Sequence, residues 1–550
     1  MRHSNLLKNL FFIIVLAPIL IYWVDFTFIT PGPFYEGYDP ETIYLMDSLS
    51  VFNGHAYGYT DHPGTPVSII GTILLAFTYP FIHNSDFTLY HLFHPELFLS
   101  LTHTFLLLAT IGGAYYLYKT SCNLLSKRTM IASLMMPLAF FALNSDGYNT
   151  TTFWSHNSFN FFFGTGILTI WVSMLKDGNL LGHKNLLFLG IALGVLSTVQ
   201  LYFLVWPICA IVTIFIFYRL KRTDYVGSFK ASLLLGLGSL IGFLVSILPI
   251  LGELSRVKEW FTRLIFHQGV YGSGEAGIIS WQTATTNFTQ MVSSQRELFI
   301  AVVVLFAIFV TLVVTERELG RAHSGLTAMG TGLIFQVIIL TILIIKHPGQ
   351  IYLLSIAATL PLLLLIDLKL LEGWVDNKNS TNRNTAYLLL LIGLLLFIGA
   401  RSIINLKDAI YRHHDNVATM NTIDVATQRF LSEYAKNAGR DRQDLVVLYT
   451  YGTYNRCYAL LFGKNYINLP IKKKIGEVCP NSYELNIWSR KVWAGFRDSQ
   501  RALDEIKWDF IIMKKTILYE RFNFLFENEI VAQISPEYPE FVIIQNHLKK

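Results

Sequence analysis

The chain has 550 residues, of which 53% are hydrophobic and only 15% are charged, and its mean hydropathy is +0.44. A soluble protein of this length carries about a quarter of its residues as charged side chains. The net charge of +6 is small and lies mostly in short loops, which indicates membrane topology and no nucleic-acid partner. We therefore expect an integral membrane protein surrounded by membrane lipids.

Apolar runs long enough to cross a bilayer core of ~30 Å recur along the first 400 residues. They lie at roughly 9–29, 66–82, 97–118, 129–144, 155–175, 184–203, 204–218, 231–252, 298–315, 324–345, 350–366 and 385–404. No small-residue cleavage site follows the first run, so we expect a retained first helix. The runs predict a polytopic α-helical membrane protein with about 11–13 transmembrane helices.

Lysine and arginine in the short loops orient the helices, because these residues concentrate on the cytoplasmic side. Basic loops contain Lys119, Lys184, Arg219, Arg317 and Lys369. They place the first loop (30–65), the loop 253–297 and the C-terminal region outside the cytoplasm, as in a multi-pass protein of the bacterial inner membrane.

The orientation contains one conflict. Two crossings between the first loop and Lys119 would put Lys119 outside. Either 66–82 or 97–118 is therefore re-entrant or interfacial, or a further crossing exists. We find no internal repeat of the kind on which many transporters are built.

Residues 405–550 have a mixed composition and no run long enough to cross a bilayer, in contrast to the membrane part at 1–404. The stretch 418–437 predicts an amphipathic helix, and 444–450, 508–513 and 540–545 predict short buried strands. This mixture favours a small soluble α/β domain. Its cysteines, Cys457 and Cys479, either pair in an oxidising compartment or remain free thiols.

The first loop concentrates acidic residues next to the membrane. They are Glu36, Asp39, Glu41, Asp47 and Asp61. Asp39 precedes Pro40, a residue tolerated at a helix start, so Asp39 is expected to cap that helix. A carboxylate fixed there can also act as a general base toward a hydroxyl group, and the two roles are compatible.

The first loop resembles that of the GT-C glycosyltransferases, which include protein O-mannosyltransferases, lipid A aminoarabinose transferases and oligosaccharyltransferases. The matching residues are Asp39, Glu41, Tyr44, Gly54 and the turn His62-Pro63-Gly64-Thr65-Pro66. The chain departs from the family because Pro40 separates the two acids and the turn reads HPGTP. The resemblance implies a GT-C catalytic domain at 1–404, with Asp39 as catalytic residue.

Two later segments agree with this resemblance. In 189–207, Gln200 stands where the family has a lysine, and Gly190 and Gly194 form a face for close helix packing. In 346–366, the residues Lys346, His347 and Tyr352 match a family segment that has a proline in mid-helix, here Pro361. Lys346 either reaches toward the interface as an anchor or binds a lipid phosphate.

The loop 253–297 contains an amphipathic stretch whose apolar face suits the membrane interface. Its polar face carries Arg263 and His267, and a glycine-rich run around Tyr271 follows. That run either approaches a ligand or serves as a connector. Family members often have a second acid at a turn comparable to 144–155; Asp146 comes early for it, and His156 and Asn157 stand where that acid is expected. No metal motif is present, so no cofactor is predicted and a divalent metal is left open.

The family implies a polyprenyl-phosphate-linked sugar as donor and a lipid, glycan or protein acceptor. Asp39 would deprotonate the acceptor hydroxyl, which displaces the phosphate with inversion of the anomeric carbon. The resemblance implies substrate contacts from Glu41, Tyr44, His62, Gln200, Arg263, His267, Tyr271, Lys346, His347 and Tyr352.

Three other functions are compatible with a polytopic membrane protein. A transporter or flippase requires ionisable residues deep in its helices, whereas the sequence places the charges at one interface. A glycan polymerase or ligase of another fold would use a large outer loop with arginine and histidine, as 253–297 offers. A scaffold with a sensor domain would have no reactive carboxylate.

Overall fold

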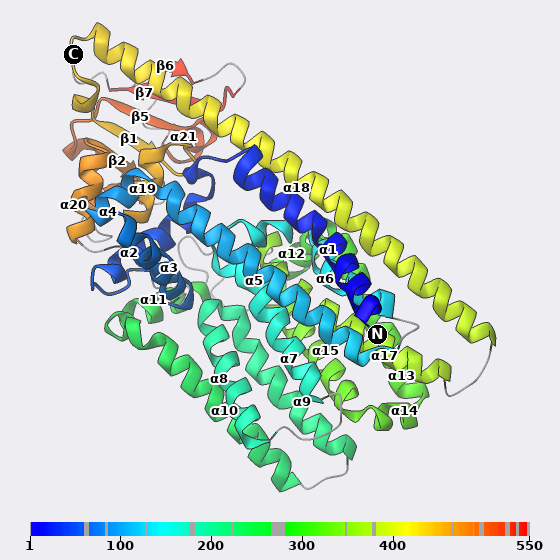
Figure 1. Ribbon diagram of the computed structural model, residues 1–550. Coiled ribbons are helices and arrows are strands. Elements are labelled where there is room, and N and C mark those ends of the chain that lie inside the picture. The colour runs from blue at the N-terminus through cyan, green and yellow to red at the C-terminus, as the bar shows by residue number, and fades with distance from the viewer. Residues whose placement is uncertain are drawn as a thin grey trace.

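A computed structural model describes residues 2–546 with internal gaps. The gaps are 60–64, 83–85, 127–129, 176–181, 222–224, 266–280, 347–348, 377–380, 465–466, 468, 488, 494–499, 523–528 and 535–537. Most of the chain forms one elongated body of helices, and a small sheet with its own helices covers one end of that body (Figure 1). We call this end the sheet end.

The helices before the gap 266–280 are mostly long and apolar. They are α1 (Arg2–Val24), α2 (Ile43–Phe52), α3 (Thr65–Thr78), α4 (Phe87–Phe93), α5 (Pro95–Leu124), α6 (Met130–Leu143), α7 (Gly166–Leu175), α8 (His183–Val199), α9 (Val205–Lys221), α10 (Tyr225–Ile247) and α11 (Leu254–Ile265). Helix α5 illustrates how they begin, because Pro95 occupies its first turn, where the absent N–H would have no partner in the helix.

The second set of helices completes the body and enters the sheet domain. The body contains α12 (Trp281–Ser294), α13 (Arg296–Thr315), α14 (Arg317–Ala322), α15 (Ser324–Ile344), α16 (Leu354–Ala357), α17 (Leu360–Asp376) and α18 (Thr381–Asn437). The sheet domain contains α19 (Arg456–Lys464), α20 (Leu469–Val478) and α21 (Lys515–Arg521). Pro361 lies in the first turn of α17 and not in mid-helix, so that expectation was wrong, because the chain bends between α16 and α17.

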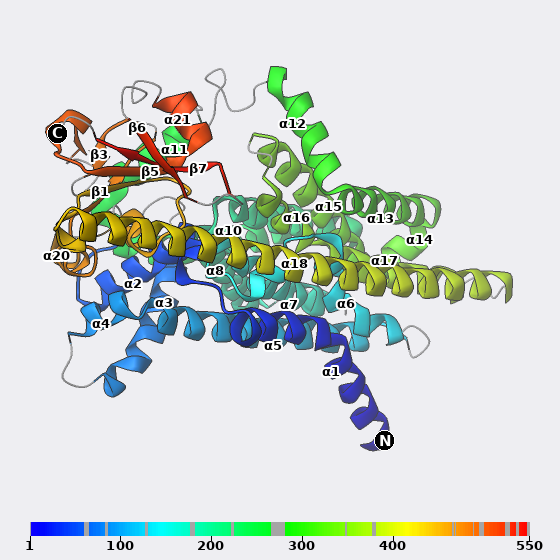
Figure 2. The same ribbon diagram turned by 90° about the horizontal axis from the view of Figure 1, so that it is seen from above.

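The position of α3 bears on the conflict in the orientation. Helix α3 lies with α2 and α4 at the sheet end (Figures 1 and 2). Together with the turn that follows it, α3 forms one of the shorter apolar helices, Thr65–Phe81. This favours the alternative in which 66–82 is re-entrant or interfacial, and that alternative stays a prediction. The end of α5 that carries Lys119 lies opposite the sheet end, as do the basic end of α9 and the short α14 (Figure 1).

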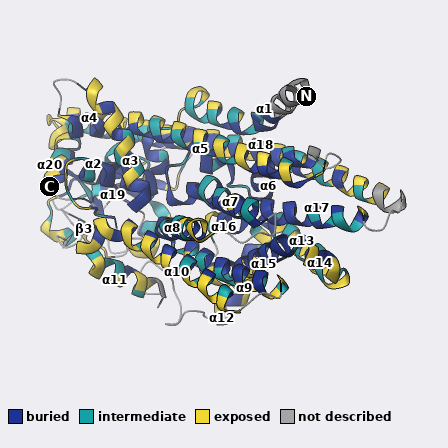
Figure 3. Cartoon of the chain, turned by 60° about the horizontal axis from the view of Figure 1, so that its bottom comes forward, coloured by how far each residue is buried: buried dark blue, intermediate teal, exposed yellow. Residues whose placement is uncertain are grey.

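The burial pattern is that of a multi-pass membrane protein. In the described part of the chain, eight helical segments are long and apolar enough to cross a membrane, and four shorter apolar helices accompany them. In the segment that contains α17, 89% of the apolar stretch is buried, against 28% in α13. Exposed residues therefore lie on the outer faces of peripheral helices such as α10 (Figure 3), and these residues are apolar, as lipid contact requires. The number of crossings stays a prediction.

Close packing joins α8 to α10. A methyl group on Gly194 would lie 2.8 Å from the backbone nitrogen of Phe243, and Gly190 faces the backbone of Leu235 and Gly238. Backbone atoms cannot move aside as side chains can, so only glycine fits there. The packing role expected for Gly190 and Gly194 is confirmed.

We expect Gly194→Ala to destabilise the protein by about 1–3 kcal/mol, because the added methyl group forces α8 and α10 apart. Gly236→Ala in α10 is the matched control, since the nearest atom to the added methyl group is 3.9 Å away. Alanine favours a helix over glycine, so the control should not lower stability. Thermal unfolding in detergent distinguishes the two variants, and equal midpoints would contradict the packing argument.

Helix α18 connects the membrane part to the sheet domain. Its 57 residues include both the predicted membrane run 385–404 and the predicted amphipathic stretch 418–437. The helix passes without a break through residue 404, where we expected the domains to divide. In Figure 1 it runs along the outside of the body to the sheet end, next to α1. The domain division stays a prediction, and one rigid helix crosses its expected position.

The C-terminal domain contains a mixed sheet with the strand order β4-β3-β2-β1-β5-β7-β6. Strand β1 pairs in parallel with β2 and β5, and the outer pairs are antiparallel. The strands are β1 (Val447–Thr450), β2 (Ser482–Leu485), β3 (Val492–Trp493), β4 (Gln500–Arg501), β5 (Phe510–Lys514), β6 (Glu529–Gln533) and β7 (Phe541–Gln545). The three predicted strands are confirmed as β1, β5 and β7, whose continuous apolar runs are buried.

Candidate active site

Asp39 lies at the sheet end of the body, between the short helical turn η2 (Phe34–Gly37) and α2. It is part of the turn η3 (Tyr38–Thr42), but its own backbone is extended, with φ −112° and ψ 104°, and its peptide bond to Pro40 is cis. Asp39 is exposed, whereas Pro40 and the residues after it are buried. An extended residue directly before a helical stretch has the backbone expected of a cap.

Two tyrosines, one in the first loop and one in the turn before α16, interact electrostatically with this carboxylate. Burial raises the pKa of the Tyr44 phenol well above its ordinary value, and the charges of Asp47 and Asp39 raise it further. Asp39 also interacts electrostatically with Tyr352, which lies in the turn η11 (Gln350–Leu353). The structure therefore brings together Asp39, Tyr44 and Tyr352, three of the residues that the sequence nominated. None of these three side chains carries a positive charge, so a cation that binds the phosphate of the donor must come from another residue.

Glu41, the second acid of the first loop, points into the protein. Its carboxylate lies 2.9 Å from Nε2 of His103 on α5, and it accepts a hydrogen bond of 2.7 Å from the backbone N–H of Trp154. Only 3% of Glu41 is exposed. These contacts anchor the first loop to α5 and to the segment around Trp154.

A buried network of polar groups lies next to Tyr44. The Tyr44 hydroxyl is 3.2 Å from Nδ1 of His156, and Nε2 of His156 is 3.2 Å from the amide nitrogen of Asn157. Gln200 donates to Asn157 at 2.9 Å, and Asn160 donates to Gln200 at 3.4 Å. The network therefore connects Tyr44 and Gln200, two predicted substrate-binding residues, through His156 and Asn157. These two stand where the family has a second acid.

Asp47 fixes the end of the first loop to α3. Its carboxylate accepts hydrogen bonds from the backbone N–H groups of Gly58 (2.9 Å) and Tyr59 (3.1 Å) and from the Ser68 hydroxyl (3.2 Å). Burial raises the pKa of the Asp47 carboxyl to about 7, although these three hydrogen bonds lower it. Asp47 therefore titrates near neutral pH in the folded protein.

The protein should lose stability as the pH rises from about 4 to about 7. Over this range Asp47 ionises in the unfolded chain but stays protonated when folded, so the folded state binds more protons. The loss amounts to at most about 4 kcal/mol. Asp47→Asn keeps an oxygen acceptor and cannot ionise, so its unfolding midpoint in detergent should depend less on pH. An unchanged pH dependence would contradict this assignment.

Lys346 follows α15 in the same connection that leads to Tyr352. It is half-buried, and burial lowers the pKa of its ammonium group. Asn287 of α12 donates a 2.9 Å hydrogen bond to the carbonyl of Ile345 and so fixes this turn. A cation that has lost part of its hydration is favourably placed to pair with an anionic ligand.

Arg263, the second cation predicted to bind substrate, has a different environment from Lys346. Arg263 is exposed on α11 and forms an ion pair with Glu259 one turn earlier. On the apolar face of the same helix, which was expected at the membrane interface, Trp260 is buried and Phe261 is exposed. The remaining nominated residues lie outside the described residues: His62, His267, Tyr271 and His347.

Sequence reasoning missed the contacts that α18 makes with the first loop. Nδ1 of His413 lies 2.9 Å from the carboxylate of Glu36, and the Tyr35 hydroxyl donates to Asp424 at 3.0 Å. The charged residues in the second half of α18 only weakly indicated a contact with the first loop, because an amphipathic helix exposed to water has the same composition. These contacts hold the loop from the side opposite α5.

Comparisons with protein-family models and with curated proteins find no match. Among solved structures, ArnT from Cupriavidus metallidurans in the apo state matches with a TM-score of 0.50 and 13% identity, over 99% of this chain and 98% of that one. This chain has the GT-C fold. ArnT from the same organism bound to undecaprenyl phosphate matches with a TM-score of 0.49, 12% identity and 97% of each chain. The apo oligosaccharyltransferase from Archaeoglobus fulgidus gives 0.46 and 11%, over 92% of this chain and 70% of that one.

The GT-C fold inferred from short motifs is thus confirmed, although sequence identity is very low. Whether the protein binds a metal stays open. The described residues contain no group of three or more histidine, cysteine, aspartate or glutamate side chains that could hold a metal ion. Asp61 and His62 of the first loop lie in the gap 60–64, next to the segment that Asp47 fixes.

Proposed function

We propose that this protein is a glycosyltransferase that moves a sugar from a polyprenyl-phosphate donor to a hydroxyl group of a lipid, glycan or protein. The observation that carries the proposal is the exposed carboxylate of Asp39 at the sheet end of the apolar helices, within electrostatic range of Tyr44 and Tyr352. The GT-C fold supports it. ArnT, which shares this fold, has been crystallised with undecaprenyl phosphate.

In the proposed reaction, Asp39 takes the proton from the acceptor hydroxyl while the hydroxyl oxygen of the acceptor attacks the anomeric carbon. The bond between that carbon and the phosphate oxygen breaks, and the phosphate keeps the electron pair. Lys346 is the described cation we assign to the growing charge on the phosphate, assisted by Arg263 and by His347. A single displacement of this kind inverts the anomeric centre.

The binding roles of the other nominated residues follow from their surroundings. Tyr44, Tyr352 and Gln200 would contact the sugar or acceptor, alone or through the network of His156 and Asn157. Glu41 would act indirectly, because both of its described hydrogen-bond partners are internal. We keep His62, His267 and Tyr271 as proposed contacts on the basis of the sequence alone.

We place the site and the sheet domain on the extracytoplasmic side of a membrane, in a bacterium the inner membrane. Two observations support this orientation. The basic loops lie opposite the sheet end, as the positive-inside rule predicts. Cys457 and Cys479 form a disulfide bond in the sheet domain, and such bonds persist in oxidising compartments.

One observation favours a transporter instead. Asp367 lies inside the apolar helix α17, is 1% exposed and has no hydrogen-bond partner among the described residues. Asp367 is a buried exception to the expected placement of the charges at one interface. A buried carboxylate in an apolar helix is typical of ion or proton pathways. Substrate transport that depends on Asp367, with no sugar transfer, would support this alternative.

Mass spectrometry of membrane glycolipids and surface glycans, with and without the protein, tests the proposal. A glycosyltransferase should add one sugar to one class of acceptor and consume one lipid-linked donor. The purified protein should then repeat the transfer with that donor in detergent or nanodiscs. Identical glycan profiles in both strains would overturn the proposal.

A further inference from the structure

The proposed base lies on a turn that is covered by the C-terminal domain. Helix α19 packs against η3, the turn that contains Asp39, and against α2 (Figure 1). The closest approach is at Gly463, where a methyl group would lie 2.9 Å from Cγ2 of Thr42 and 2.9 Å from Cγ of Met46. Thr42 and Met46 are themselves buried, so they have little room to move. The distance between α19 and the turn is thus set by the absence of a side chain at Gly463.

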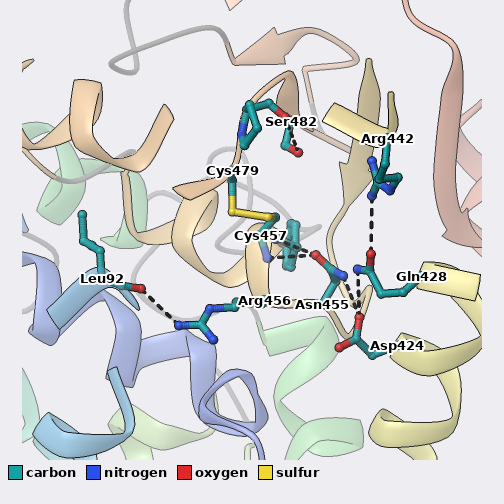
Figure 4. The surroundings of a disulfide bond; sticks show 11 residues. Leu92, Asp424, Gln428, Arg442, Asn455, Arg456, Cys457, Cys479 and Ser482 are labelled. Atoms are coloured by element: carbon teal, nitrogen blue, oxygen red, sulfur yellow. Dashed lines mark hydrogen bonds between the residues drawn. A yellow bond between two sulfur atoms is a disulfide. The ribbon is translucent and has the colours of Figure 1, made fainter. Parts of the chain in front are cut away.

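Hydrogen bonds fix the start of α19 relative to the first loop. The side-chain oxygen of Asn455 accepts from the backbone N–H of Cys457 at 2.8 Å, and its amide nitrogen donates to Asp424 at 2.7 Å. The other oxygen of Asp424 accepts from Tyr35, immediately before the Asp39 turn. Figure 4 shows Asn455 between Asp424 and Cys457. A continuous chain of contacts therefore leads from the first loop through α18 to α19.

A disulfide bond then closes α19 onto α20. Cys457 in the first turn of α19 is bonded to Cys479, which directly follows α20 (Figure 4). Lys474 of α20 pairs with Asp86 at 2.6 Å, at the start of α4. Cys479 is buried and Cys457 is half-buried, so a small thiol can reach the bond from one side. We call residues 456–479 the cystine hairpin.

We infer that the cystine hairpin positions the Asp39 turn, with Gly463 and the disulfide as positioning groups, so that catalysis depends on the thiol–disulfide state of the C-terminal domain. This inference rests on the proposed function. The domain would then position the reacting group through the contacts of α19 and the disulfide, without touching the substrate. Movement of a reacting group by about 1 Å can reduce a rate by about 10²-fold, so a small shift of α19 is sufficient.

The variant Gly463→Ala tests the inference, with Gly476→Ala in α20 as the matched control. Gly476 is exposed, and no atom lies within 4 Å of an added methyl group. We expect Gly463→Ala to lower kcat by about tenfold or more at nearly constant KM. Thr42→Ser removes Cγ2, one of the atoms in the clash, and should restore part of kcat in the double variant. Gly476→Ala should match the wild type.

Hydrogen exchange of residues 34–44 provides a readout that does not need activity. Gly463→Ala, and reduction of the wild type with dithiothreitol, should both speed exchange there, while Gly476→Ala should not. The double variant Cys457→Ser/Cys479→Ser should resemble the reduced protein and no longer respond to dithiothreitol. Unchanged exchange in Gly463→Ala and in the reduced protein would overturn the inference. A different pair of results would reject the proposed base and keep the positioning role. Exchange would be faster in Gly463→Ala, while Asp39→Asn would keep full transfer activity.

Discussion

Asp39→Asn is expected to lower sugar transfer by about 10²–10⁴-fold, the usual contribution of a general base. Asparagine has nearly the same shape as aspartate but cannot take a proton from the acceptor hydroxyl. The side chain is exposed, so the change should leave folding and the unfolding midpoint unaffected. Single-turnover assays with a lipid-linked sugar in nanodiscs would measure the chemical step apart from donor binding.

Asp415→Asn is the control for this experiment, because Asp415 is an exposed carboxylate on α18. It should transfer sugar at the wild-type rate. Donor affinity should be the same in both variants, since Asp39 is proposed to contact the acceptor and the phosphate is assigned to Lys346. If Asp39→Asn keeps full turnover, Asp39 is not the base. If it loses donor binding and turnover together, the carboxylate acts in binding and not in proton transfer.

The convergence of Asp39, Tyr44 and Tyr352 could be predicted from the sequence, because each lies in a segment with its own motif. The direction of each side chain could not. Asp39 and Glu41 are two residues apart, and both were nominated for the site. Asp39 lies before the helical stretch and is exposed, whereas Glu41 lies within it and is buried.

Elements with local signals were predicted more reliably than contacts between distant segments. The apolar runs of β1, β5 and β7 sufficed to find three strands. Hydropathy alone does not say whether 66–82 crosses the membrane, because a short apolar helix such as α3 has the same composition as part of a span. Likewise, sequence left the pairing of Cys457 and Cys479 open, and it required the fold of the sheet domain to bring them together.

Glu41→Ala should cause the largest loss of stability among the changes in the first loop. It removes the acceptor for the Trp154 N–H and the partner of His103, and both groups are buried. An unsatisfied buried polar group costs about 1–3 kcal/mol, so the two together should cost several kcal/mol. Unfolding by heat or denaturant in detergent measures this loss, and the variant should also transfer sugar poorly because the loop loses its anchor to α5.

Glu41→Gln distinguishes this structural role from substrate binding. Glutamine keeps an oxygen that can accept from the Trp154 N–H and from His103 Nε2–H, so most of the stability should return. If Glu41 only anchors the loop, activity should return with stability, and Glu433→Ala, at an exposed site on α18, should change neither. Wild-type stability in Glu41→Gln with a large loss of transfer would show that the negative charge itself is needed. Glu41 would then belong with Asp39 in the chemistry, despite its buried position.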